Sequence, residues 1–392
     1  MIDKVKTEQC CLCKACFDSC AKGAISFTKE HKGFFYPEVD TSLCVRCGRC
    51  EDACPALSPL FEKEAGYPIA FAARSKDREI RLQSASGGVF YELARKVLED
   101  GGYVCAAVFT ADFRVKHIVT DNIKSLKDMQ GSKYAQSDTA GVYKKIRQLL
   151  TDGKTVLFCG CPCQSAALRS YLKKEYENLY AVDLICHGIP SQSMLDSYLA
   201  LQEEKYGARV ASLHFRDKVK GWHSSSVKIA FENGKVYSEP MTIDAYMKGY
   251  FGNITIKSHC YNCRYKEFHS GSDLTLGDFW GAEVELDEID DNTGLNAVTV
   301  NSKKGKSLLK LIDVELVDVD IRTILKYNKL LTESAKRSDR RDAFYAFAEM
   351  NGTKEAIQKY FCESKTDKIK REARYAVRCA YYKLRGKDKP LY

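Results

Sequence analysis

Two cysteine runs near the N-terminus restrict the fold of this 392-residue chain more than any other feature. Each run has the spacing C-x2-C-x2-C-x3-C. In this pattern three thiolates of a run bind one 4Fe-4S cluster, while the fourth binds the cluster of the other run. The spacing therefore predicts two clusters, the first held by Cys10, Cys13, Cys16 and Cys54 and the second by Cys44, Cys47, Cys50 and Cys20.

Zinc is the main alternative occupant of such a cysteine-rich segment. Zinc sites usually combine paired C-x2-C groups, whereas two complete four-cysteine runs are typical of cluster-binding modules. Cys11 adds a thiol beside the first ligand, and Ala21 stands where the second run is followed by Pro55. Neither departure removes a predicted ligand. Short strands are expected between the runs, on either side of Lys32-Gly33.

The composition indicates the cellular setting. Eighteen cysteines would suit a disulfide scaffold only in a short secreted chain, and here many have metal-ligand spacings, which favours a reducing compartment. No apolar run is long enough to span a membrane, and residues 1–9 are polar, without the apolar core of a signal peptide. We therefore expect a soluble cytoplasmic protein with about two or three domains.

From Tyr67 onward, apolar strands alternate with helical periods, which predicts a layered α/β body. Strands are expected over 67–73 and 103–109, with a helix over 88–100 between them. Ser86, Gly87 and Gly88 stand at the start of this helix, where backbone amides and the positive end of the helix dipole suit an anion. The turn predicts a phosphate site, and an ordinary serine-glycine cap without a ligand is the alternative.

A third set of cysteines follows two βα units. Strands are expected over 155–159 and 179–185, and because they belong to consecutive βα units, their carboxyl ends share one edge of the sheet. Loops that carry Cys161, Cys163 and Cys186 follow these strands. A C-x2-C pair farther along the chain completes the set, which predicts a third 4Fe-4S cluster on Cys163, Cys186, Cys260 and Cys263.

Other interpretations of these thiols stay open at this point. Cys161 is either a bystander or a substitute ligand for Cys163, and Cys159 is expected as a small core residue of its strand. A zinc site is a competing assignment, because a C-x2-C pair with two scattered cysteines suits zinc as well. A redox disulfide formed by Cys161 or Cys163 is another.

Several short motifs together resemble those of the family of coenzyme F420 hydrogenase/dehydrogenase beta subunits, and their order through most of residues 1–310 is specific. They are the two cysteine runs, Ser86-Gly87-Gly88, GSKYAQS at 131–137, GCPCQ at 160–164, DLICHG at 183–188, FRDK at 215–218, Cys260-x2-Cys263 and GDFWG at 277–281. The family's GTPC-like turn here reads Gly160-Cys161-Pro162-Cys163, which adds a thiol and leaves the ligand in this turn open.

The resemblance implies an FAD-binding fold, a 4Fe-4S cluster in the body, and hydride exchange between the flavin and an organic molecule. It favours the phosphate interpretation of the Ser86-Gly87-Gly88 turn. It also implies flavin contacts at Lys133, Tyr134 and Ser137.

The expected architecture combines α+β and α/β parts in four segments. Residues 1–62 form a bacterial-type two-cluster ferredoxin domain, 66–150 and 151–325 form the two portions of a layered flavin-binding α/β body, and 326–392 form a helical basic tail. The last 28 residues hold ten Lys/Arg against three Asp/Glu. Such a helix suits an anionic membrane surface or an acidic partner, and a helix docked on its own protein is the simpler alternative.

These features predict an iron-sulfur flavoprotein oxidoreductase that moves electrons between ferredoxin-type clusters and FAD. Its expected partners are ferredoxin or another redox protein and a small redox molecule, a deazaflavin or another compound. The alternative is an electron-relay subunit of a larger redox complex without a substrate of its own. Neither a Walker-type loop nor a Ser/His/Asp set occurs, which argues against an NTPase or a hydrolase, and nucleic acid is not expected.

Overall fold

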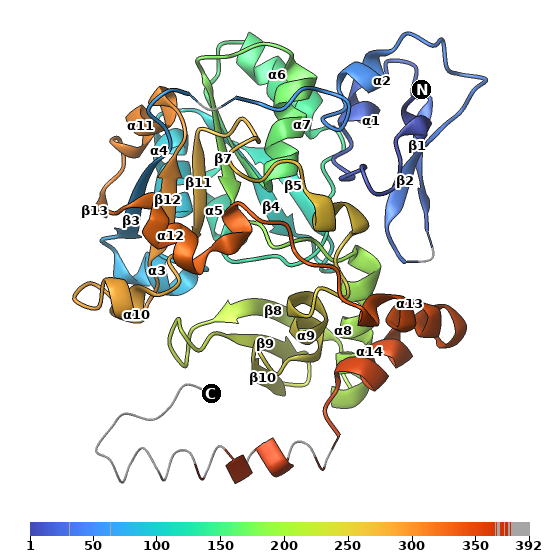
Figure 1. Cartoon of the computed structure of the whole chain (residues 1–392), viewed down its shortest axis with the longest axis vertical. Helices are drawn as coiled ribbons and strands as arrows, with labels where there is room; N and C mark the ends of the chain where they lie inside the picture. The colour runs from blue at the N-terminus through green and yellow to red at the C-terminus, as the bar shows by residue number, and fades with distance from the viewer. Residues whose placement is uncertain are drawn as a thin grey trace. The chain divides into compact units, whose positions relative to one another are not determined.

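The computed structural model describes residues 1–30, 32–62 and 64–364, with a few single positions between 366 and 377. The chain divides into two compact units (Figure 1). The first consists of Met1–Gln192 and Ile256–Lys336, and the second of Ser193–Thr255 and the chain after Lys336.

The N-terminal part of the first unit is small and has little regular structure. A 3-10 helix η1 (Ile2–Lys4) and two short helices, α1 (Ala15–Ser19) and α2 (Arg49–Asp52), accompany the antiparallel strands β1 (Ile25–Lys29) and β2 (Phe35–Val39). Its apolar core is correspondingly small and includes cysteine sulfurs, because Cys16 and Cys54 pack with Ile2 and Ile25. The two strands lie where the sequence predicts them.

The rest of the first unit is built on an eight-stranded mixed sheet of order β13-β3-β12-β11-β7-β6-β4-β5. Strands β11, β7, β6 and β4 run parallel, while β12, β13 and β5 are antiparallel to their neighbours. The parallel centre matches the predicted βα units, and the antiparallel strands were not foreseen. The bounds are β3 (Ile69–Ser75), β4 (Tyr103–Phe109), β5 (Val115–Thr120), β6 (Val156–Gly160), β7 (Leu179–Leu184), β11 (Leu274–Asp278), β12 (Asn296–Val300) and β13 (Val314–Asp318).

Helices cover both faces of this sheet. On one face, α4 (Val89–Glu99), α5 (Leu126–Met129) and α11 (Lys303–Leu309) pack against apolar strand residues. On the other face lie α6 (Val142–Thr151) and α7 (Pro162–Leu172). Strand β6 contributes side chains to the apolar core on both faces. Leu157 and Cys159 pack with the first helix layer, and Val156 and Phe158 pack with the second. Cys159 is therefore a core residue, as expected.

Shorter elements surround the sheet. They include α3 (Arg78–Gln83), η2 (Ile123–Ser125), η3 (Ser258–Asn262), α10 (Ala282–Glu285), α12 (Ile321–Tyr327) and η4 (Lys329–Leu331). None of the helices in the described part of the chain combines the length and the apolar character needed to cross a membrane.

The second unit contains an antiparallel sheet of order β10-β9-β8, from β8 (Val210–Asp217), β9 (Ser226–Phe231) and β10 (Val236–Pro240). Its helices are α9 (Ala245–Phe251), α13 (Arg340–Asn351), α14 (Thr353–Phe361) and most of α8 (Gln192–Tyr206). Asp244 caps α9 and accepts hydrogen bonds from the hydroxyls of Tyr198 and Tyr237, at 2.5 and 2.8 Å. A buried polar centre therefore joins helix and sheet within this unit.

The compact units cut the chain differently from the expected domains. The point between 150 and 151, where the two portions of the expected body meet, lies inside the first unit, and β4 pairs directly with β6 across it. The portion expected over 151–325 contributes to both units. In the segment expected over 326–392, α13 and α14 are helical, but most of the basic amphipathic stretch lies outside the described residues.

Candidate iron-sulfur centres

The two N-terminal cysteine runs share an unusual backbone conformation. Leu12 and Lys14 flank Cys13 with φ angles of 57° and 60°, and Arg46 and Gly48 flank Cys47 with φ angles of 52° and 76°. Left-handed residues at equivalent positions curl each run, and backbone that alternates in hand forms concavities of amide groups that suit anions such as iron-sulfur clusters. Three of the four left-handed residues carry side chains, so the conformation has a steric cost that a function explains.

The four thiols predicted for the first cluster line one cavity. Cys10, Cys13 and Cys16 come from the first run and Cys54 from the second, and apolar side chains including Ile2 and Phe27 complete the wall. Burial raises the pKa of Cys54 to about 12 and also raises that of Cys16. Thiolates are thus unfavourable in this cavity unless a positive group such as iron stabilises them.

The thiols predicted for the second cluster lie nearer the surface. Cys47 is exposed, while Cys20, Cys44 and Cys50 are partly exposed. Cys20 accepts a hydrogen bond on Sγ from the amide of Ala24 at 3.3 Å. The two sets therefore differ in solvent contact although their sequence patterns are the same.

The N-terminal part contacts the body at the N-terminus of α6. The Asp18 carboxylate accepts hydrogen bonds from the amides of Gly141 at 2.6 Å and Tyr143 at 2.9 Å, where α6 begins. It thereby caps a helix whose own N-cap is a glycine. Lys14 forms an ion pair with Asp138 at 2.7 Å. These contacts fix the first cysteine run next to the body.

The body cysteines meet at one edge of the sheet. Strands β6 and β7 are parallel neighbours, with Cys159 paired to Val182, so the loops that follow them emerge side by side. Cys161 is the N-cap of α7, and Cys163 lies in its first turn. The segment with the C-x2-C pair is held to the loop after β7, because the Lys257 amide donates to the Ile189 carbonyl at 2.8 Å.

The four predicted body thiols lie together with two more. Cys260 interacts electrostatically with Cys186 and Cys263, and Cys163 with Cys263. Cys161 interacts with Cys186 and lowers the pKa of Cys186 to about 7. Cys11, from the ferredoxin-type part, packs in one buried cluster with Cys13, and Cys163 packs against that cluster. The first cavity and the body site are therefore adjacent, with Cys11 between them.

Three buried polar atoms around these thiols have no hydrogen-bond partner among the described residues. They are Lys257 Nζ, His259 Nε2 and the Tyr265 hydroxyl. Each interacts electrostatically with Cys11, and Tyr265 also with Cys13 and Cys163. Unpaired buried polar groups are costly, and thiolate-bound clusters carry negative charge that such groups stabilise. The surroundings of both sites thus fit iron-sulfur clusters.

The residues implied as flavin contacts lie near the same edge of the sheet. Lys133 Nζ donates to the carbonyls of Gln130 at 2.8 Å and Gly131 at 3.3 Å, and burial lowers the pKa of Lys133 to about 7. Ser137 hydrogen bonds to His117, whose other ring nitrogen bonds to the Cys159 carbonyl. A partly buried ammonium held only by carbonyls fits an added anionic group. Tyr134 is half-buried in the same loop.

The Ser86-Gly87-Gly88 turn has contacts that explain its sequence without a ligand. The Ser86 hydroxyl donates to the Leu295 carbonyl at 2.7 Å. A Cβ on Gly87 would lie 2.6 Å from the Ala73 carbonyl oxygen and 2.8 Å from the Asn296 amide, and Gly88 has a φ of 85°. These glycines are therefore required by strand packing and by the turn, and phosphate binding here stays a prediction.

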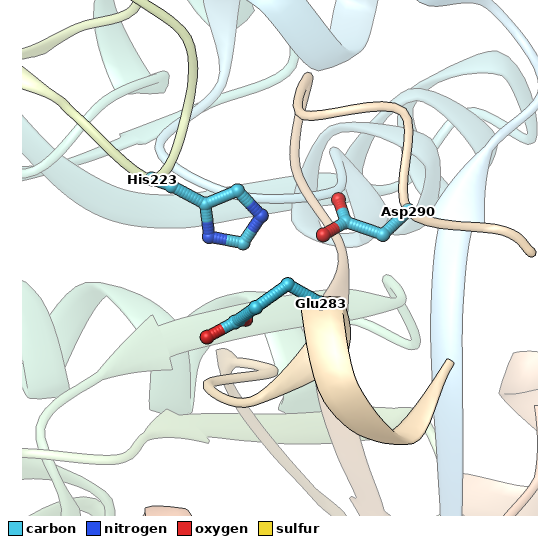
Figure 2. Close-up of side chains that lie close together, drawn as sticks. All are labelled: His223, Glu283 and Asp290. Atoms are coloured by element: carbon cyan, nitrogen blue, oxygen red, sulfur yellow. The ribbon is translucent and has the colours of Figure 1, made fainter. Parts of the chain in front are cut away.

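A further group of side chains with metal-binding chemistry is drawn in Figure 2. Glu283 lies on α10 and Asp290 in the loop after it, whereas His223 lies in the loop between β8 and β9. Glu283 and Asp290 belong to the first unit and His223 to the second, so the three do not make a site within one unit.

Sequence reasoning missed the groups that surround the thiols. Lys257, His259 and Tyr265 flank the C-x2-C pair, but single Lys, His and Tyr residues near a cysteine pair carry no recognisable signal. Cys11 was identified only as an extra thiol. Its adjacency to Cys163 depends on how the ferredoxin-type part docks on the body, which spacing does not encode.

Comparison with known proteins supports the resemblance seen in the sequence. A 4Fe-4S dicluster domain model matches residues 9–57. The N-terminal and C-terminal models for the beta subunit of coenzyme F420 hydrogenase/dehydrogenase match residues 70–144 and 153–320. Together the latter two cover more than half of the chain.

Individual proteins are similar to portions of this chain. One subunit of the F(420)H(2) dehydrogenase of Methanosarcina mazei is 21% identical over 250 residues, covering 60% of this chain and 68% of that protein. An uncharacterized ferredoxin of Methanocaldococcus jannaschii is 37% identical over 58 residues, covering 15% of this chain and 74% of that protein. A chain from the F420-reducing [NiFe] hydrogenase complex of Methanosarcina barkeri is 18% identical, with 69% of this chain and 92% of that one covered and a TM-score of 0.45.

The N-terminal cysteine runs thus form a 4Fe-4S ferredoxin-type domain, and the prediction of such a domain ahead of a mixed α/β body is confirmed. The chain belongs to the family of coenzyme F420 hydrogenase/dehydrogenase beta subunits.

Proposed function

We propose that this chain is an iron-sulfur flavoprotein oxidoreductase that moves electrons between two ferredoxin-type clusters, a third cluster in the body, and FAD. The observation that carries the proposal is the packing of Cys11 and Cys13 in one buried cluster with Cys163 against it. Cys13 belongs to the first predicted ligand set and Cys163 to the body set. Adjacent ligand sets allow electrons to pass between clusters without a mobile carrier.

Cys163 is proposed as the fourth ligand of the body cluster, with Cys161 as its substitute. Cys163 interacts electrostatically with Cys263, and Cys161 with Cys186 and Cys260, so both thiols lie beside the other three. The proposed set is Cys163, Cys186, Cys260 and Cys263.

The flavin is proposed at the edge of the sheet beside this set. Lys133 would hold a phosphate of FAD, with Tyr134 and Ser137 in the same loop and the turn of Ser86, Gly87 and Gly88 nearby. Gln130 Nε2 donates to the Ser84 hydroxyl at 3.2 Å, which ties this loop to the turn. Bound FAD supplies the conversion between single electrons and a hydride, which clusters cannot perform.

A small redox molecule, a deazaflavin or another compound, is the proposed hydride partner, and ferredoxin or another redox protein the proposed electron partner. The second candidate function is an electron-relay subunit of a larger complex. It is favoured by the name of the M. mazei relative, which is a subunit of a dehydrogenase. A relay subunit would bind the clusters but would oxidise or reduce no small molecule alone.

Metal and flavin analysis of anaerobically purified protein tests the proposal. We expect about twelve irons per chain, four for each of three clusters, and FAD after reconstitution. Cys186→Ala and Cys260→Ala should each lose about four irons, keep the N-terminal clusters, and block reduction of the flavin by ferredoxin. Loss of a single zinc instead, or flavin reduction at the wild-type rate, would show that the body site is structural.

A further inference from the structure

Lys257 is a buried cation in an unusual setting. Its side chain is 1% exposed, and Nζ has no hydrogen-bond partner among the described residues. Nζ lies 3.8 Å from the centre of the Tyr36 ring and 4.8 Å from that of Phe34. Both rings belong to the ferredoxin-type part, while Lys257 precedes η3 in the body. The ammonium therefore lies where the two parts meet.

Cysteines of the two ligand sets lie around Lys257, and the amide of Cys260 donates to the Lys257 carbonyl at 2.9 Å. Lys257 interacts electrostatically with Cys10, Cys260 and Cys11, and also with Glu30. Burial lowers its pKa, and these groups raise it. Aromatic rings compensate only part of the cost of burying an ammonium. Negative charge on thiolates that coordinate a cluster would compensate the remaining cost of burying the ammonium.

Other polar groups in this region serve different purposes. Lys266 donates to the carbonyls of Cys186 and Leu330, so its ammonium is held by backbone oxygens. Burial lowers the pKa of His259, which favours a neutral ring. Lys257 differs from both, because its side chain is cationic and its Nζ has no hydrogen-bond partner among the described residues.

We propose that Lys257 is a fixed positive charge shared by the first cluster and the body cluster, and that it raises the reduction potentials of both. The inference rests on the ligand sets of the proposed function. Electron transfer between a reduced first cluster and an oxidised body cluster would form or break no bond, and Lys257 would keep its proton. The charge would stabilise the more negative, reduced form of each cluster, so both potentials would rise, while the driving force between the clusters would change only by the difference between the two shifts.

Redox titration of the whole chain, followed by electron paramagnetic resonance, tests this. Lys257→Met keeps most of the side-chain volume and removes the charge. We expect the reduction potentials of the first and body clusters each to fall by at least about 59 mV. This shift corresponds to a tenfold change in the equilibrium constant of a one-electron reduction. Lys257→Arg should stay near wild type. Lys173→Met is the matched control, since Lys173 also pairs across the two parts, with Asp52, but is solvent-exposed.

Each result decides the question. Unchanged potentials in Lys257→Met with full iron content would overturn the proposal. If Lys257→Met and Lys257→Gln both lose iron while Lys257→Arg keeps it, the charge is needed to hold the clusters, which supports it. Loss of iron in Lys257→Arg as well would indicate a purely steric role and overturn it. If the wild type binds no body cluster, the body ligands of the proposed function fail, and a potential shift confined to the first cluster would show that the charge is not shared, which overturns this proposal.

Discussion

The ferredoxin-type part and the body present cysteines in two different ways. In the first, eight cysteines of two local repeats adopt matching backbone curls, with left-handed residues on both sides of Cys13 and of Cys47. In the body, thiols from three separate segments meet because parallel strands β6 and β7 end at the same edge and a distant loop is tied beside them. Local backbone geometry prepares one kind of site, and tertiary packing assembles the other.

This difference has a consequence for how the sites respond to change. A local site depends on its own turns and on the small core beneath them. An assembled site depends on the sheet, so a disturbance anywhere in its three segments separates the thiols. Substitutions in each part can therefore test the contrast.

The largest expected effect concerns the exchange of ligands between the two local repeats. Cys54→Ser should remove about four irons and abolish the signal of the first cluster, although Cys54 lies in the second run. The physical reason is that its sulfur lines the cavity with Cys10, Cys13 and Cys16. Spectroscopy of the reduced protein measures this, with Cys11→Ala as the control that keeps both clusters. Damage confined to the second cluster would refute the crossed arrangement.

The next effect distinguishes the two thiols of the Gly160–Cys163 turn. On the proposed ligand set, Cys163→Ala should lose about four irons, whereas Cys161→Ala should keep them because Cys161 does not belong to that set. Iron content of the two reconstituted variants gives the answer directly. The reverse pattern would make Cys161 the fourth body ligand.

A smaller effect is expected where the local part is anchored to the assembled one. Asp18→Ala leaves the first amides of α6 without their cap and should lower the free energy of unfolding by about 1 to 2 kcal/mol. Asp18→Asn should cost less, because an amide oxygen still accepts. Thermal unfolding under anaerobic conditions measures both variants. Iron content should not change, and a loss of iron would mean that docking is required for cluster binding.

The smallest effects test the left-handed residues themselves. Arg46 is exposed with a φ of 52°, so Arg46→Gly should stabilise the protein by up to about 1 kcal/mol by relieving steric cost. Gly48→Ala should destabilise it by about 1 kcal/mol, since no atom lies near the added Cβ and only the φ of 76° opposes it. Equal stability of both variants would show that the curl imposes no strain.

Much of the fold could be predicted because its signals are local. The strands at 103–109 and near 156 and 179, and the helices that follow, were expected from apolar runs and periodicity. The three-stranded sheet of the second unit and the antiparallel strands β12 and β13 were not. Their partners are distant in the chain, so short-range patterns do not specify how they pair.

By itself the sequence determined the ferredoxin-type domain and the family, because fixed cysteine spacings and ordered short motifs are carried by the chain without reference to contacts. Only the tertiary structure decided that Cys11 lies between Cys13 and Cys163, that Gly87 packs against β3 and β12, and that Lys257 is buried against Tyr36. Each of these joins residues from separate segments. Such contacts depend on how whole elements pack, and no local spacing encodes that.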